Sequence, residues 1–174
     1  MSHEAESRVQ LQSVQKFLGI SDLPEEQHDN LEGSCQWIDE RQDFRDWRDA
    51  TYQLDMTKET QYSPSIYWVN ASPGAGKTVL AAYVSSQLKE FHLQHAVFYF
   101  HSGKKASQLL PSFFRSIAFQ MARSTAAVRD AMAKLHQDGV TYDLDDARAV
   151  WSKVFRAGIL QVCCAHQFSE RYTM

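Results

Sequence analysis

The chain has 174 residues, of which 44% are hydrophobic and 22% are charged, and its formal net charge is -3. This length and composition are typical of one ordinary soluble domain with a sizeable core, and they argue against an intrinsically disordered chain. The small negative charge gives no bulk electrostatic reason to expect a nucleic acid or an anionic membrane as a partner.

The sequence predicts a cytoplasmic protein with reduced thiols. No apolar run comes near the roughly 18 residues of a membrane-spanning helix, and the N-terminal residues lack the continuous apolar segment of a signal peptide. Cys35, Cys163 and Cys164 form neither a disulfide framework nor a CxxC metal pattern, so we expect no metal site from them.

Residues 1–50 carry the signals of a helical lead-in, and residues 51–64 those of a linker. A first helix is indicated by apolar residues at helical spacing, which are Leu11, Val14, Phe17 and Leu18. Ser34 then precedes a short run that contains Trp37 and Ile38. Polar residues and Pro64 dominate the linker, which we expect on the surface.

The next segments alternate between strand and helix signals. Residues 66–69 are short, apolar and rich in aromatic and β-branched side chains, which predicts a strand buried on both faces. A helix is expected from Lys77, with apolar positions at Leu80, Tyr83, Val84 and Leu88. Residues 96–100 read as a second strand, so the alternation favours the α/β class.

Helical periodicity predicts further helices in the last third of the chain. One follows Pro111, with Phe113, Phe114, Ile117 and Met121 on one face. Another ends near Gly139 and carries Val128, Met132 and Leu135. The last begins after Asp143, Asp145 and Asp146, with a stripe formed by Ala147, Val150, Trp151, Val154 and Phe155.

The stretch ASPGAGKT fits the phosphate-loop pattern, with alanine in the first position, where glycine is more usual. A phosphate at a helix N-terminus needs converging backbone N–H groups and a chain that approaches more closely than a Cβ permits, which glycine allows. The pattern predicts a site for ATP or GTP with Mg²⁺ formed by Ala71, Ser72, Pro73, Gly74, Ala75, Gly76, Lys77 and Thr78. The amides of residues 74–76 cradle the phosphates, Lys77 reaches the β and γ phosphates, and the Thr78 hydroxyl binds Mg²⁺. The alternative is a glycine turn in an unrelated strand–helix connection.

With an upstream CQWIDERQDFRDW, this SPGAGKT loop and a downstream FYFHSG, the chain resembles the fungal NACHT-type proteins, whose N-terminal ATPase module is nephrocystin-like. The resemblance covers about residues 31–162 and implies a P-loop NTPase three-layer α/β fold after the helical lead-in. Residues 65–162 would then be the N-terminal part of that domain, and residues 163–174 an atypical tail. It also implies a STAND-class signalling ATPase, in which the nucleotide state switches an oligomerisation module.

The resemblance further implies a Walker B strand, several apolar residues followed by an acidic pair, after VFRAGILQV. The chain instead ends in CCAHQFSERYTM, and Asp143, Asp145 and Asp146 follow no apolar run, so we assign these aspartates to helix capping. We expect a partial, truncated domain with no catalytic residue and little or no hydrolysis. Without neighbouring strands, residues 66–69 should make the protein marginally stable and prone to self-association.

Two other functions stay open. The first is a non-catalytic fragment that associates with full-length relatives, and the second is a small-molecule P-loop kinase. Two interpretations also stay open for residues outside the loop. His101, Lys104 and Lys105, which follow the second predicted strand, lie either near the nucleotide or in a solvated turn. Trp37, Phe44 and Trp47 contribute to an adenine pocket or to the core.

Overall fold

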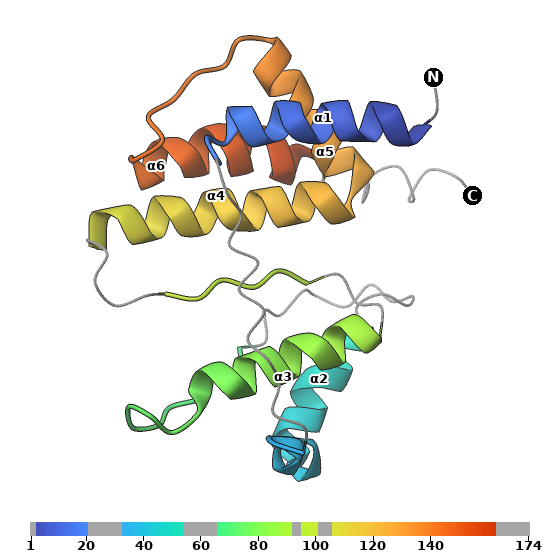
Figure 1. The fold of residues 1–174 in the computed structure, drawn as a ribbon, viewed down its shortest axis with the longest axis vertical. Coiled ribbons are helices and arrows are strands. Elements are labelled where there is room, and N and C mark those ends of the chain that lie inside the picture. The colour runs from blue at the N-terminus through green and yellow to red at the C-terminus, as the bar shows by residue number, and fades with distance from the viewer. Residues whose placement is uncertain (1–2, 21–32, 54–65, 92–94, 101–105, 163–174) are drawn as a thin grey trace. The chain divides into compact units, whose positions relative to one another are not determined.

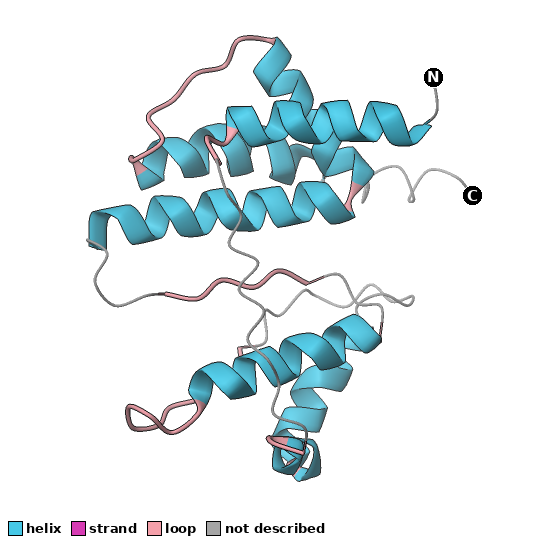
Figure 2. Cartoon of the chain, in the orientation of Figure 1, coloured by secondary structure: helices cyan, strands magenta, loops and turns pink. Residues whose placement is uncertain are grey.

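The computed structural model describes residues 3–20, 33–53, 66–91, 95–100 and 106–162. These residues form helices joined by turns and irregular segments, and none of them belongs to a β-strand (Figure 2). The described part of the chain is therefore all-α. The predicted α/β fold, a partial P-loop NTPase three-layer fold, is wrong, because neither apolar segment expected to be a strand has a strand partner among the described residues.

Packing divides the chain into two units. Unit 1 comprises Met1–Glu25 and Gln94–Met174, and unit 2 comprises Glu26–Leu93. Their boundaries cut across the predicted lead-in, since its first helix belongs to unit 1 and its later part to unit 2. The domain boundaries expected at residues 50, 64 and 162 stay predictions.

Unit 1 is a bundle of helices. Its elements are α1 (His3–Phe17), α4 (Ala106–Ser124), α5 (Ala126–Gln137), α6 (Ala147–Val150) and η2 (Trp151–Ile159), a π-helical stretch that directly continues α6. Helix α1 lies along α5 and also contacts α4, while α5 packs on α4 and η2 (Figure 1). Helix α4 begins before Pro111 rather than after it, so Pro111 lies inside the helix, where it has no N–H to donate to the carbonyl four residues earlier.

The predicted apolar stripes of α1, α5 and α6–η2 meet in one core. Each stripe faces a neighbouring helix, so burial of these side chains is the main stabilising contribution to the bundle. Helix α4 contributes a face other than its predicted stripe, of which Phe114, Ile117 and Met121 are only partly buried. The buried residues of the core are Val14, Phe17, Leu18, Ala118, Phe119, Ala122, Val128, Met132, Ala133, Val150, Val154, Phe155 and Ile159. Trp151, which the stripe included, is instead 42% exposed.

The C-terminal end of α1 is closed by contacts from distant parts of unit 1. Gly19 adopts a left-handed φ of 59°, as expected for a residue that ends a helix. The Arg115 guanidinium donates to the carbonyl oxygens of Leu18 and Gly19, both at 3.2 Å, and the Tyr142 hydroxyl donates to that of Phe17 at 2.9 Å. These donors satisfy carbonyls that the helix itself leaves free.

Residues 96–100, predicted as a strand, form an irregular segment against α4. The side chain of Gln120 takes the place of a neighbouring strand: its amide nitrogen donates to the Val97 carbonyl (2.8 Å), and its oxygen accepts from the Val97 N–H (3.0 Å). Phe98 meets the ring of Phe113 edge to face at 5.5 Å. The backbone of Val97 is thus satisfied by a helix, and the predicted strand is wrong.

Unit 2 contains η1 (Gln36–Glu40), α2 (Gln42–Gln53) and α3 (Lys77–Glu90). Helix α3 confirms the helix predicted from Lys77. The core of unit 2 is small, with Ile38, Phe44 and Leu80 buried and with Cys35, Trp47, Tyr67, Tyr83 and Val84 partly buried around them.

Residues 66–69 were predicted as a strand buried on both faces, and this prediction is wrong. Ile66 and Trp68 are 83% and 81% exposed, and only Tyr67 contacts the core of unit 2. A strand needs hydrogen-bonded neighbours, and no other described segment supplies them.

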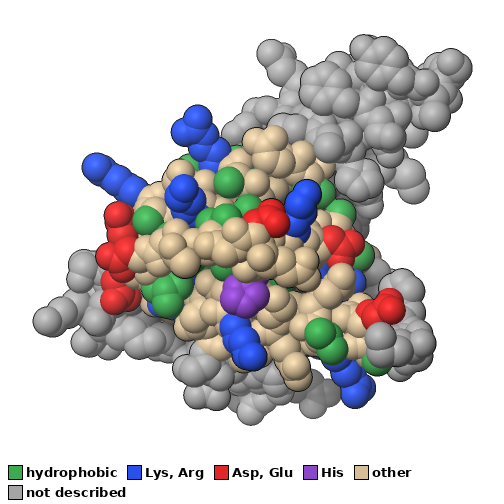
Figure 3. Space-filling view, turned by 90° about the horizontal axis from the view of Figure 1, so that it is seen from above, with side chains coloured by type: hydrophobic (Ala, Val, Ile, Leu, Met, Phe, Trp, Pro, Cys, Tyr) green, Lys and Arg blue, Asp and Glu red, His purple; other side chains and the backbone are tan. Residues whose placement is uncertain are grey.

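On the face drawn in Figure 3, Lys and Arg side chains are interspersed with Asp and Glu side chains over the described residues. Within the described ranges, none of the helices has both the length and the apolar character needed to cross a bilayer.

Candidate functional site

The predicted phosphate loop leads directly into α3. Its turn is closed by a hydrogen bond from the Ala75 N–H to the Ser72 carbonyl at 3.2 Å, and the Leu80 N–H bonds the Gly76 carbonyl at 2.9 Å. Gly74 and Gly76 have φ angles of 79° and 83°, in the left-handed region that glycine adopts without strain. Apart from the chain neighbours, no described residue lies within 4 Å of where a Cβ would stand at either glycine.

Lys77 folds back over this loop. Its ammonium group donates hydrogen bonds to the carbonyl oxygens of Ala71 at 2.7 Å and Ser72 at 2.8 Å. All of residues 71–78 are exposed, including Thr78 in the first turn of α3. The structure therefore brings together the charge, the glycines and the hydroxyl of the predicted site on one exposed loop.

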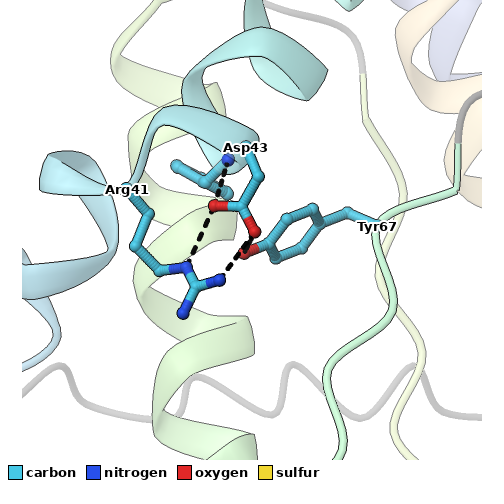
Figure 4. Close-up of polar contacts among 4 residues, drawn as sticks. Arg41, Asp43 and Tyr67 are labelled. Carbon is cyan, nitrogen blue, oxygen red and sulfur yellow. Dashed lines mark hydrogen bonds and ion pairs between the residues drawn. The ribbon is translucent and has the colours of Figure 1, made fainter.

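The segment before the loop is anchored on α2 through Tyr67. The Tyr67 hydroxyl donates to a carboxylate oxygen of Asp43 at 3.4 Å, and Arg41 binds the same carboxylate through two hydrogen bonds, at 3.0 and 2.7 Å (Figure 4). The Arg41 hydrogen bonds hold the pKa of Asp43 at about 2, and the carboxylate in turn raises the pKa of Arg41. The Tyr67 ring packs on Phe44 and Trp47, with centroids 5.5 and 5.8 Å away.

A further contact joins the element upstream of the loop to α3. The Tyr83 hydroxyl donates to the Asp39 carboxylate, and the Arg48 guanidinium lies 3.8 Å from the other oxygen of that carboxylate. The hydrogen bond to Asp39 raises the pKa of Tyr83 to about 12. The sequence analysis missed this contact, since the only signal was the position of Tyr83 on the apolar stripe of α3.

The family described as "Nephrocystin 3, N-terminal" matches residues 33–170. The chain belongs to this family. The match begins just before η1 and includes the loop, α3 and most of unit 1. No curated protein and no solved structure matches the chain. The nephrocystin-like part of the predicted resemblance is thus confirmed. The resemblance rested in part on the segment CQWIDERQDFRDW, and in the structure Asp39 and Asp43 of this segment are hydrogen-bonded to Tyr83 and Tyr67 of unit 2.

Within the region matched by the nephrocystin 3 family, the helix capping predicted for the DLDDA aspartates is confirmed for Asp146, whereas Asp143 closes a turn. The carboxylate of Asp143 accepts from the Asp145 N–H at 2.9 Å, and that of Asp146 accepts from the Arg148 N–H at the start of α6 at 2.8 Å. Among the described residues, no group of His, Cys, Asp and Glu side chains is arranged to hold a metal ion.

The aromatic residues upstream of the loop divide between core and surface. Phe44 is 2% exposed and Trp47 is partly buried beside it, which agrees with the core interpretation for these two, whereas Trp37 is 53% exposed. Cys35 is a free thiol. The other weak candidates, His101, Lys104, Lys105, Cys163 and Cys164, lie outside the described residues.

Proposed function

We propose that this nephrocystin 3 family member binds a nucleoside triphosphate with Mg²⁺ through the loop of residues 71–78. The observation that carries the proposal is the placement of the Lys77 ammonium over an exposed glycine loop at the start of α3. A cation held there, together with the partial positive charge of a helix N-terminus, favours a phosphate group.

Each predicted residue has a role that suits its position. The amides of Gly74, Ala75 and Gly76 would donate to phosphate oxygens, and the open space beside both glycines would admit them. Lys77 would exchange its hydrogen bonds to neutral carbonyls for stronger, charge-assisted contacts to phosphate. Thr78 would supply a hydroxyl to Mg²⁺, which in nucleotide sites takes few protein ligands and completes its shell with phosphate oxygens and water.

The proposed activity is binding with little or no hydrolysis. Hydrolysis needs a residue that orients the attacking water and a carboxylate that supports the metal. The carboxylates of Asp143 and Asp146 accept turn and cap hydrogen bonds, and none of the three DLDDA aspartates follows an apolar run. Such a domain would act as a nucleotide-dependent signalling module of the NACHT type, in the role that the sequence resemblance implies.

Titration calorimetry with Mg-ATP and with Mg-GTP tests the proposal. Lys77→Ala should weaken binding at least about tenfold, because a charge-assisted contact to phosphate is lost. The matched control is Lys89→Ala, which removes an equal charge from the last turn of the same helix and should leave the affinity unchanged. Equal affinities for the parent and Lys77→Ala, or no heat of binding with the parent, would refute it.

A further inference from the structure

Both ends of the phosphate loop are attached to one upstream segment, residues 36–48, which comprises η1 and the first part of α2. Tyr67 lies on the chain that enters the loop, and its hydroxyl donates to the carboxylate of Asp43 (Figure 4). Tyr83 lies on the helix that follows the loop, and its hydroxyl donates to the carboxylate of Asp39. The start and the end of the loop are therefore held by the same piece of chain.

The upstream segment is internally well connected. The Arg45 guanidinium on α2 donates to the Asp39 carbonyl oxygen of η1 at 3.1 Å, and the Arg48 guanidinium lies 3.8 Å from the Asp39 carboxylate. Ile38 of η1 and Phe44 of α2 are buried in the same core. Because η1 and α2 are joined in this way, a displacement of either one would move an attachment point of the loop.

Lys77 makes a third link, which joins the two ends of the loop directly. Its ammonium group donates to the carbonyl oxygens of Ala71 and Ser72. Under the proposed function, Lys77 gives up these two hydrogen bonds when it turns to a phosphate group. The tyrosine attachments use none of the atoms that would contact the phosphates, so a nucleotide can bind without breaking them.

We infer, on the basis of the proposed function, that Tyr67 and Tyr83 are positioning residues for nucleotide binding, which hold the ends of the loop once the Lys77 link is released. A phosphate bound by backbone amides needs donors in a fixed, convergent arrangement. A site whose supporting contacts are loose must order them on binding, and this ordering lowers the affinity. The upstream segment thus contributes to the affinity without contacting the nucleotide.

Titration calorimetry with Mg-ATP measures this contribution. Tyr67→Leu removes a ring and its hydroxyl, and Tyr83→Phe removes one hydroxyl; each should weaken binding about threefold to tenfold, the range expected for one lost contact. Tyr67→Phe keeps the ring on Phe44 and Trp47 and should recover most of the affinity lost in Tyr67→Leu. The losses should be the same with Mg-GTP, because the attachments act on the phosphate loop and not on the base.

Two controls separate positioning from a general loss of stability. Trp68→Leu changes the neighbouring aromatic side chain, which is 81% exposed, and should leave the affinity unchanged. Ile38→Val removes one buried methyl group but keeps both attachments, so it should lower the melting temperature without weakening binding. Parent-like affinity in Tyr83→Phe, or an equal loss in either control, would overturn the inference. Tyr83→Phe changes a single hydroxyl and keeps the test valid if Tyr67→Leu does not fold.

A nucleotide-free measurement distinguishes failure of this inference from failure of nucleotide binding. Backbone order parameters from ¹⁵N relaxation report the rigidity of the Gly74 and Gly76 amides in the full chain. Lys77→Ala alone should leave them above about 0.6, because the tyrosine attachments still hold the loop, whereas Lys77→Ala combined with Tyr83→Phe should bring them below it. A parent that binds no nucleotide would refute the proposed function. A parent that binds, with a loop that stays rigid in the double variant, would overturn the inference alone.

Discussion

The hydroxyl of Tyr83 on α3 is hydrogen-bonded to the carboxylate of Asp39 on η1, 44 residues earlier in the chain. This bond joins the element upstream of the loop to the helix that follows it. The other carboxylate oxygen of Asp39 is buried and has no hydrogen-bond partner among the described residues. Tyr83 and the nearby Arg48 are therefore the described side chains that offset the cost of placing the Asp39 carboxylate in unit 2.

Tyr83→Phe should lower the free energy of unfolding by about 1–3 kcal/mol, because it leaves a partly buried carboxylate without its hydrogen-bond donor. Urea denaturation measures the change. Asp39→Asn alone and the double variant complete a double-mutant cycle, in which the two substitutions should be clearly less costly together than the sum of their separate effects. Strict additivity would show that the Tyr83–Asp39 bond contributes nothing to stability.

Tyr142→Phe should cost about 1 kcal/mol at neutral pH, because the Phe17 carbonyl at the end of α1 loses its donor. Burial raises the pKa of Tyr142 from 10.0 to about 12, so the folded protein retains this proton at pH values where the unfolded chain releases it. The contribution of Tyr142 is fully present below about pH 10 and is lost as the pH rises through the folded pKa.

Denaturation curves collected between neutral and alkaline pH test this titration. The parent should lose stability more steeply than Tyr142→Phe above about pH 10, where an unperturbed tyrosine ionises. Some alkaline loss should remain in the variant, because the pKa of Tyr83 is also raised to about 12. Parallel curves for the two proteins would contradict the prediction.

Gly19→Ala should destabilise unit 1 by about 2–3 kcal/mol, through its left-handed backbone and a steric clash. A Cβ at this position would collide with the side chain of Leu144 and approach the Arg115 guanidinium at 3.4 Å. Gly33→Ala is a matched control, since Gly33 has a φ of 81° but no described residue within 4 Å of its Cβ position. Thermal melts should show the larger loss for Gly19→Ala, and adding Leu144→Ala should reduce the difference.

Steady-state ATP hydrolysis by the parent should equal that of Lys77→Ala, because hydrolysis needs a carboxylate that supports the metal, and the described residues contain no group of His, Cys, Asp and Glu side chains arranged to hold a metal ion. A phosphate-release assay over several hours gives the required sensitivity. Turnover clearly above the Lys77→Ala control would reveal a catalytic carboxylate, and Asp143, Asp145 and Asp146 would be the first to replace.

The sequence by itself determined the features that depend on neighbours within a few residues. Helix α3 and helix α5 follow from their apolar spacing, and the end of α5 follows from Gly139, which has a φ of 72°. The cap at Asp146 involves a residue only two positions away. The glycines of the loop adopt left-handed angles that the pattern GAG itself suggests.

Only the tertiary structure decided what happens to the two apolar segments read as strands. A strand is stabilised by partners far away in sequence, and composition does not show whether such partners are present. Val97 obtains its backbone hydrogen bonds from Gln120 on α4, and residues 66–70 obtain none from the described residues. The Tyr83–Asp39 bond and the closure of α1 by Tyr142, which is 125 residues from Phe17, likewise join parts of the chain that no local pattern connects.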